Sequence, residues 1–153
     1  MKYYRANFDL IFSEMLSSLN RTSRFPQTKG YIQHGRVSVY EHSIHVARVS
    51  CKLALFLHLR VDYASLIRGG LLHDYFLYDW HDSDKSHRLH GFRHPKTALR
   101  NAKEDFDLTK TEQNIIVSHM FPLTLRSFPC CLEAWIVCIA DKICATKETF
   151  HLG

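Results

Sequence analysis

The sequence predicts an all-α protein, a single-domain bundle of about six helices. Apolar residues recur at three- and four-residue steps almost throughout the chain. Two Ser/Thr-x-x-Glu capping boxes, at Ser38 and Thr109, mark helix starts inside this pattern. No segment shows a convincing strand pattern. The 153 residues suit one domain, residues 1–153, that is long enough to bury a core.

The first predicted helix runs from about Arg5 to Leu19, where apolar side chains form one stripe. A proline and a glycine then interrupt the pattern, so we expect residues 20–35 to form a connector. Residues 1–35 therefore make up an N-terminal helix and connector. Residues 36–147 are expected to form the core of the domain, which is also where we expect it to bind metal.

The second and third helices have clear starting signals. Ser38 is the predicted N-cap of the second helix, and Glu41 stands three residues further on. The third helix begins near Asp62, which is another residue type favoured at the N-cap. We expect His73 and Asp74 to lie on one side of this third helix.

A long loop is predicted at residues 78–93, which are polar, aromatic and basic without a clear period. Long loops in compact domains are usually functional or disordered, and the aromatic residues favour a function here. The fourth helix is predicted to begin at His94, with Pro95 at the first helical position.

The last two helices follow from the remaining signals. Thr109 and Glu112 form the second capping box, and the fifth helix is expected to stop before Pro122. The last helix is predicted to begin near Pro129 and to end at about Thr146.

Composition restricts the class of protein. No apolar run approaches the roughly 20 residues that span a bilayer, and the N-terminus lacks the pattern of a secretory signal. The five cysteines form no C-x-x-C pair, so we expect reduced core thiols in a cytoplasmic protein. The net charge of +5 suits a small anionic ligand, whereas the scattered basic residues make nucleic-acid binding unlikely.

Two aspartates occur inside apolar helical stretches: Asp74 within residues 71–77, and Asp141 at the end of residues 135–141. A buried carboxylate is costly unless a partner compensates its charge. Bound metal ions would compensate both, with histidines as further ligands. The candidate ligands are His42, His73, Asp74, His94, His119 and Asp141.

Six ligands are too many for one catalytic ion that must keep open positions, but they suit two ions bridged by Asp74. Imidazole and carboxylate ligands favour divalent Fe or Mn, and Co, Ni or Zn also fit. Two such ions and two aspartates leave a net +2 that attracts a phosphate group. Water between the ions would become a nucleophile near neutral pH, which makes His73 and Asp74 the candidate catalytic residues.

Structural roles remain open for each of these residues taken singly. A lone buried histidine is more often a hydrogen-bonded core residue. Asp74 alone could be a helix-end residue that meets the loop, and Asp141 could pair with a nearby arginine or lysine. A second pair, His81 and Asp82, lacks apolar neighbours and is expected in the loop rather than among the ligands. His45 is expected on the surface or behind the ligands.

The predicted loop also supplies candidate substrate contacts. Loops above a rigid site often bind substrate, and basic side chains there could clamp a phosphate. A solvated charged loop is the alternative. The candidates are Lys85, His87, Arg88 and His90.

The order His, His-Asp, Asp resembles the HD-domain superfamily of metal-dependent phosphohydrolases. Residues 40–44 (Tyr-Glu-His-Ser-Ile) resemble the helix of its first histidine, residues 69–74 (Gly-Gly-Leu-Leu-His-Asp) its name-giving motif, and residues 139–142 (Ile-Ala-Asp-Lys) its closing aspartate. The resemblance covers roughly residues 36–147. It implies an HD-domain-like all-α fold and a phosphohydrolase acting on a small phosphate ester or nucleotide.

His94 and His119 resemble the extra ligands of two-metal members such as the HD-GYP cyclic-dinucleotide phosphodiesterases. Residues 75–78 (Tyr-Phe-Leu-Tyr) replace the Gly and Lys of that subgroup, which argues against a cyclic-dinucleotide substrate. Mixed-valent di-iron oxygenases of the myo-inositol-oxygenase type share the ligand set, so they are an alternative. A non-catalytic metal- or nucleotide-binding module is another, and a homo-oligomer is possible.

Overall fold

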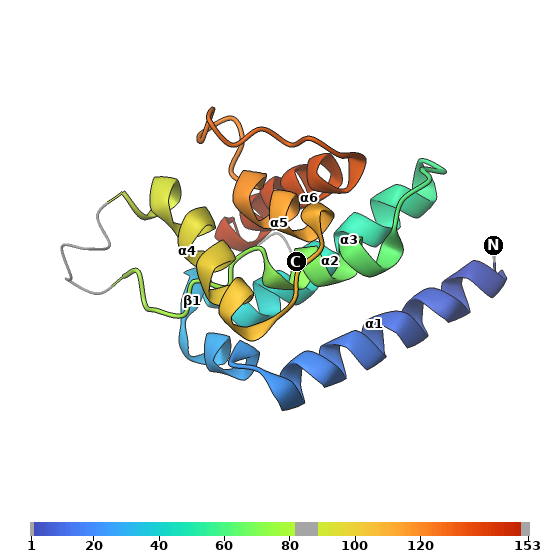
Figure 1. The fold of residues 1–153 in the computed structure, drawn as a ribbon, viewed down its shortest axis with the longest axis horizontal. Coiled ribbons are helices and arrows are strands. Elements are labelled where there is room, and N and C mark those ends of the chain that lie inside the picture. The colour runs from blue at the N-terminus through green and yellow to red at the C-terminus, as the bar shows by residue number, and fades with distance from the viewer. Residues whose placement is uncertain (1, 82–88, 151–153) are drawn as a thin grey trace.

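The structure is a computed structural model that describes residues 2–81 and 89–150. Helices dominate it and surround a common core, as Figure 1 shows, which confirms the prediction of an all-α fold. The α-helices of the described residues are α1 (Lys2–Thr22), α2 (Val39–Phe56), α3 (Tyr63–Leu72), α4 (His90–Asp105), α5 (Lys110–Ser118) and α6 (Leu132–Thr149).

The connector after α1 contains structure that the sequence did not indicate. A 3₁₀-helix, η1 (Phe25–Gly30), is followed by two short antiparallel strands, β1 (Ile32–His34) and β2 (Val37–Ser38). Strands of three and two residues are too short to show an alternating pattern. The turn between them contains Gly35, whose φ of 58° is readily adopted only by glycine. The expectation of no strand was therefore wrong at this point.

The predicted helix starts are confirmed where a capping residue marked them. The Ser38 hydroxyl accepts from the Glu41 backbone N–H at 3.2 Å, and the Glu41 carboxylate accepts from the Ser38 N–H at 3.0 Å. Thr109 and Glu112 form the same reciprocal pair at the start of α5. Asp62 caps α3 through the Ala64 N–H at 3.0 Å.

Other helix boundaries differ from the prediction. α4 begins at His90 rather than His94, because the Leu89 carbonyl already accepts from the Phe92 and Arg93 N–H groups. Pro95 consequently lies inside the helix and not at its first position. α6 starts and ends three residues later than expected, at Leu132 and Thr149.

Two candidate ligands lie just beyond helix ends. α3 stops at Leu72, so His73 is its C-cap and Asp74 is in the following turn. His119 is likewise the C-cap of α5. The expectation that α3 itself carries His73 and Asp74 was therefore wrong by one and two residues. The difference matters because a helix end can aim a side chain across the end of the bundle.

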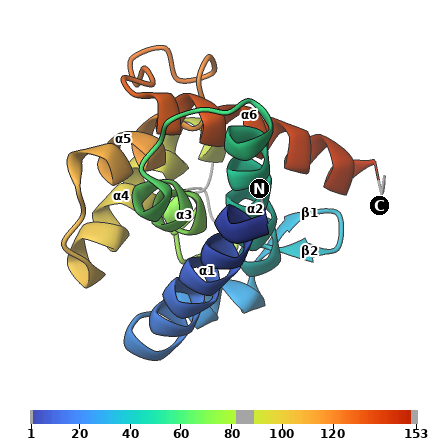
Figure 2. The same cartoon turned by 90° about the vertical axis from the view of Figure 1, so that its right-hand side faces the viewer.

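The core forms where α2 packs against α3 and α6, while α5 packs against α3, α4 and α6. α1 lies along the outside of this bundle in both views (Figures 1 and 2). Cys51, Cys138 and Cys144 are buried, and all five cysteines are free thiols. Among the described residues, no helix has the length and apolar character needed to span a bilayer.

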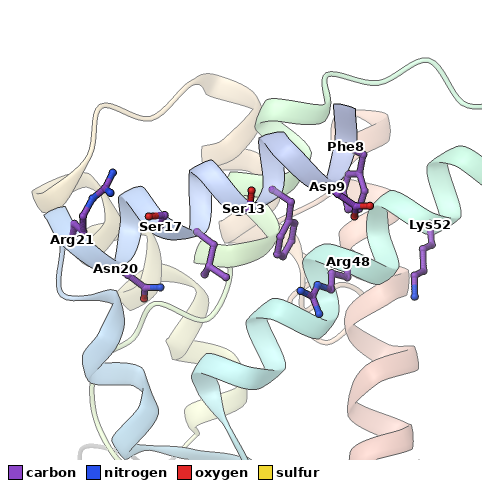
Figure 3. Close-up of a pocket in the computed structure, with 10 residues that line it drawn as sticks. Phe8, Asp9, Ser13, Ser17, Asn20, Arg21, Arg48 and Lys52 are labelled. Carbon is purple, nitrogen blue, oxygen red and sulfur yellow. The ribbon is translucent and has the colours of Figure 1, made fainter. Parts of the chain in front are cut away.

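A groove of about 610 Å³ runs between α1 and α2, as Figure 3 shows. Phe8, Phe12 and Leu16 of α1 line it together with Arg48 and Lys52 of α2. The Arg48 guanidinium lies over the Phe12 ring, 5.1 Å from its centroid, so it forms a cation–π contact there. None of the six candidate ligands lines this groove.

Glycine lets α3 approach α2 closely enough to aim the His73-Asp74 turn. A Cβ atom at Gly70 would lie 3.0 Å from the Ala47 Cα atom and 3.1 Å from its Cβ atom. The Ala47 backbone cannot move away without shifting α2. We expect Gly70→Ala to lower the free energy of unfolding by about 1–3 kcal/mol, as measured by urea denaturation.

Gly30→Ala is the matched control. Apart from its own chain neighbours, no atom of the described residues lies within 4 Å of the position of its added Cβ. The substitution should leave stability within about 0.5 kcal/mol of the wild type. Equal losses in the two variants would contradict the role assigned to the close approach of α3 to α2.

Candidate metal centre

The structure brings the six candidate ligands together from five parts of the chain. They come from the first turn of α2, the turn after α3, α4, the end of α5, and α6. Each is between 0% and 7% exposed. Such convergence of side chains from facing helices is how helical bundles build metal sites. The residues are His42, His73, Asp74, His94, His119 and Asp141.

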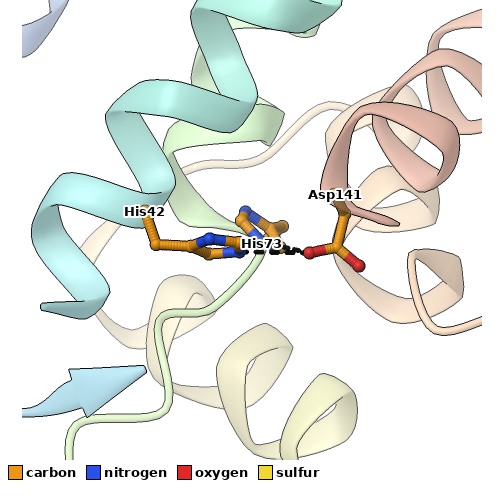
Figure 4. Close-up of side chains that lie close together, drawn as sticks. All are labelled: His42, His73 and Asp141. Carbon is orange, nitrogen blue, oxygen red and sulfur yellow. Dashed lines mark hydrogen bonds and ion pairs between the residues drawn. The ribbon is translucent and has the colours of Figure 1, made fainter. Parts of the chain in front are cut away.

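One group of ligand atoms gathers around the carboxylate of Asp141, as Figure 4 shows. Its Oδ1 atom lies 3.1 Å from His42 Nε2 and 3.6 Å from His73 Nε2. The Oδ2 atom of Asp74 faces the same group, 3.4 Å from His73 Nε2 and 3.8 Å from His42 Nε2. Two imidazoles and two carboxylate oxygens therefore converge on one point.

A second group forms on the other oxygen of Asp74. Its Oδ1 atom lies 3.1 Å from His94 Nε2 and 3.3 Å from His119 Nε2. The two imidazole Nε2 atoms are 2.8 Å apart. The carboxylate of Asp74 thus presents one oxygen to each pair of histidines.

Hydrogen bonds fix the orientation of three of the four imidazoles. A backbone carbonyl only accepts, so each Nδ1 that contacts one must carry the proton. In the neutral form of each ring, the Nε2 atom then keeps its lone pair for a ligand. The contacts are His73 Nδ1 to Gly70 O at 2.8 Å, His94 Nδ1 to His90 O at 3.0 Å, and His119 Nδ1 to Ile116 O at 2.8 Å.

These contacts also explain why the local sequence folds as it does. The last carbonyls of a helix have no partner within the helix. His73 and His119 each follow a helix end and bind the carbonyl three residues back. One side chain thereby completes the helix end and directs its Nε2 atom into the centre.

The buried polar atoms of the centre fit a cation. With both Nδ1 atoms protonated and both rings neutral, His94 Nε2 and His119 Nε2 would face each other as two lone pairs, which cannot form a hydrogen bond. His73 Nε2 and Asp74 Oδ1 are buried without a hydrogen-bond partner among the described residues. Buried polar groups are almost always satisfied. Divalent metal ions bind imidazole nitrogen and carboxylate oxygen, so they match this donor set.

The charge balance also favours cations. Burial alone would lower the pKa of His42, but the carboxylates of Asp141 and Glu148 outweigh it and raise that pKa to about 9. Burial would also lower the pKa of His73, but the carboxylates of Asp74 and Asp141 outweigh that effect and raise the pKa. Protons therefore occupy these rings when nothing else neutralises the aspartates. Metal ions must displace those protons, so metal affinity will fall as the pH is lowered.

Glu148 supports His42 and was missed in the sequence. Its Oε2 atom accepts from His42 Nδ1 at 2.7 Å, and its Oε1 atom lies 2.8 Å from His45 Nδ1. His45 itself is half exposed. Glu148 lies two helical turns after Asp141, a spacing that could have revealed it, but the predicted helix ended at Thr146.

Gln33 and Lys142 also act on the ligands. The Gln33 amide donates to Asp74 Oδ2, and no periodicity marked this residue because it is on the short strand β1. The Lys142 ammonium donates to the carbonyl of His119 at 3.0 Å. It thereby ties the end of α5 to α6.

Of the predicted substrate contacts, His90 lies within the described residues, whereas Lys85, His87 and Arg88 lie outside them. The His90 ring stacks on that of His94 at 4.5 Å between centroids, and its Nδ1 atom lies 2.9 Å from the Tyr78 hydroxyl. His90 therefore contacts a candidate ligand. A contact with substrate stays a prediction.

The second His-Asp pair is only partly described. His81 is exposed, lies beside Asp79 at 3.3 Å, and belongs to neither group of candidate ligand atoms. Asp82 lies outside the described residues.

Comparison with protein families identifies the class. The HD-domain family model matches residues 39–146, more than two thirds of the chain. The chain therefore belongs to the HD-domain family, a superfamily of metal-dependent phosphohydrolases. No curated protein and no solved structure matches it in the corresponding comparisons. Glu148 lies beyond the matched range.

Loss of Glu148 should weaken metal binding, because Glu148 holds His42 through its Nδ1 atom. Carboxylates behind a ligand histidine fix its tautomer, and their removal typically reduces metal affinity by about 10- to 100-fold. We expect Glu148→Ala to show a loss of that size in a chelator-competition titration with Mn²⁺. Its far-ultraviolet circular dichroism should match that of the wild type.

His45→Ala is the control, because it removes another partner of Glu148 and leaves the His42 contact intact. Its Mn²⁺ affinity should stay within about threefold of the wild type. If Glu148→Ala binds Mn²⁺ as tightly as His45→Ala does, Glu148 does not position a ligand.

Proposed function

We propose that this protein is a phosphohydrolase that uses two metal ions to activate water against a small phosphate ester or nucleotide. Family membership supports metal-dependent hydrolysis of phosphate esters. The arrangement of Asp74 carries the two-ion part of the proposal. Its two oxygens face separate pairs of imidazoles, at 3.1–3.3 Å on one side and 3.4–3.8 Å on the other.

Each residue has a definite role in this proposal. His42, His73 and Asp141 would hold one ion, and His94 and His119 would hold the second. Asp74 would contribute one carboxylate oxygen to each, and the Gln33 amide keeps its Oδ2 atom directed at His42 and His73. With the imidazole Nδ1 atoms already bonded, the ligands are oriented before the ions bind.

Bound divalent ions supply water of lowered pKa and stabilise negative charge on phosphoryl oxygens. The chain supplies the geometry. The ligands are buried among apolar helices, so bulk water does not weaken the electrostatic interactions of the centre. Two aspartates neutralise only half of the four charges that two such ions bring. The remaining positive charge favours a phosphate group over a neutral substrate.

The same four imidazoles and two carboxylates favour a second candidate, a mixed-valent di-iron oxygenase. Ligand identity does not separate the two chemistries, because a fold and its ligands host different reactions. Two equivalents of iron, a half-oxidised electron-paramagnetic signal and substrate-dependent oxygen uptake would establish the oxygenase. Tight nucleotide binding without turnover would instead indicate a non-catalytic binding module.

The number of ions can be measured directly. We expect protein purified without chelator to hold two equivalents of first-row metal by elemental analysis. His94→Ala and His119→Ala should each retain about one equivalent, because the first pair of histidines and Asp141 stay intact. The exposed His81→Ala variant should retain two. If neither His94→Ala nor His119→Ala changes the metal content, the two-ion proposal fails and a single-ion centre remains.

Activity should depend on the bridging carboxylate. Screened with Mn²⁺ or Fe²⁺ against phosphomonoesters and phosphodiesters, the wild type should turn over at least one substrate class. Asp74→Asn keeps the volume of the side chain but removes its charge, so turnover should fall to background. His81→Ala should remain active. Absence of turnover in folded, metal-loaded wild type would count against hydrolysis.

A further inference from the structure

A hollow of about 520 Å³ lies beside the metal centre and contains none of its ligands. Its lining includes three arginines, one from the start of η1 and two from α4, together with aromatic and hydroxyl side chains. These lining residues are Arg24, Phe76, Tyr78, Arg93, Thr97 and Arg100. The hollow is therefore cationic and carries few apolar groups that a neutral ligand could use.

The charges in the hollow are unevenly compensated. Arg24 pairs with Glu104 and Asp105, at 2.9 Å in each case. Arg93 and Arg100 form no ion pair within residues 2–81 and 89–150. The carboxylates nearest to them along α4 are those that Arg24 already binds. Among the described residues, two guanidinium charges of the hollow therefore have no carboxylate partner.

Helical spacing arranges the donors of α4. Arg93, Thr97 and Arg100 follow each other at steps of four and three residues, which places them on one face of the helix. His94, one residue after Arg93, points inward with 3% exposure. α4 thus carries a candidate metal ligand on its inner side and these donors on its outer side.

One residue connects the hollow with the metal centre. Phe76 lines the hollow and packs edge-on against the His94 ring, at 5.7 Å between ring centroids. Leu77 follows with a φ of 58°, which is uncommon for a leucine and costs energy. Strain of this kind persists where the surrounding structure imposes it. The chain accordingly turns from Asp74 directly into the wall of the hollow.

We propose that this hollow binds a phosphate group distinct from the one that is attacked at the metal centre. Guanidinium groups present planar pairs of N–H donors that match phosphate oxygens, and the Thr97 hydroxyl adds a donor between them. The phosphate is either a second phosphate of the substrate or a free phosphate compound. The binding claim itself does not depend on the proposed hydrolysis.

Inorganic pyrophosphate is the probe. A thermal melt first shows that the full-length chain is folded in excess chelator, and pyrophosphate is then titrated into it by isothermal calorimetry. Without metal ions the hollow is the expected binding site. We expect a Kd of about 1 mM or tighter. Arg93→Gln and Arg100→Gln should each weaken binding about tenfold, because each removes a charge-assisted contact.

Lys103→Gln is the control, because it removes the same charge from the same helix outside the hollow. Its affinity should stay within about twofold of the wild type. Absence of pyrophosphate binding to the wild type would overturn the proposal. An equal loss in Lys103→Gln and Arg100→Gln would also overturn it, since diffuse attraction to a basic surface would then explain binding.

A second measurement distinguishes the two sources of the phosphate. The metal-loaded enzyme is assayed with two substrates that it hydrolyses, a bisphosphorylated compound and the matching monophosphate. If the hollow holds the second phosphate of the substrate, Arg100→Gln should raise the KM of the bisphosphorylated compound about tenfold. The KM of the matching monophosphate should not change. Unchanged KM values for both, together with weakened pyrophosphate binding, would assign the hollow to a free phosphate compound. Failure of hydrolysis would leave the calorimetric result intact.

Discussion

The buried carboxylate of Asp74 is the constraint on which the rest of the structure depends. With 1% of its surface exposed, it could not remain charged without compensating groups. Burial alone would raise its pKa, but His73, His119 and His94 outweigh burial and keep that pKa well below its usual range. Elements distant in sequence must therefore meet at one point. The close approach of Gly70 to α2 sets where that point lies.

Helix ends do much of the positioning. His73 and His119 cap α3 and α5 with their Nδ1 atoms, so the bonds that satisfy the backbone also orient the ligand atoms. The Lys142 ammonium reinforces one of these ends by binding the carbonyl of His119. A ligand held in this way loses little conformational freedom when a metal ion binds. The same hydrogen bonds therefore stabilise the fold and orient the candidate ligand atoms before a metal ion binds.

The sequence predicted the parts of this arrangement that local chemistry determines. Capping residues marked α2, α3 and α5, and apolar neighbours distinguished Asp74 and Asp141 from surface carboxylates. The predicted start of α4 was wrong because proline is common at the first helical position, which pointed to Pro95. Nothing in the local sequence revealed that the helix begins at His90, about a turn earlier. Gln33 could not be assigned, since it acts on a residue that only folding brings near. Glu148 was missed for another reason, because the predicted last helix ended at Thr146, before it.

Side-chain contacts keep α4, with the candidate ligand His94, in register with the His73-Asp74 turn. Asn101 donates from α4 to the carbonyls of Tyr75 and Phe76 at 3.0 Å, directly after Asp74. The Tyr75 hydroxyl donates to the Asp105 carboxylate at the end of α4, at 2.6 Å, and the Arg24 guanidinium binds the same carboxylate. α4 is thus tied to the segment that bears Asp74. Because the proposed phosphate hollow is built from these same elements, an anion bound there would stabilise the arrangement that holds His94 against Asp74.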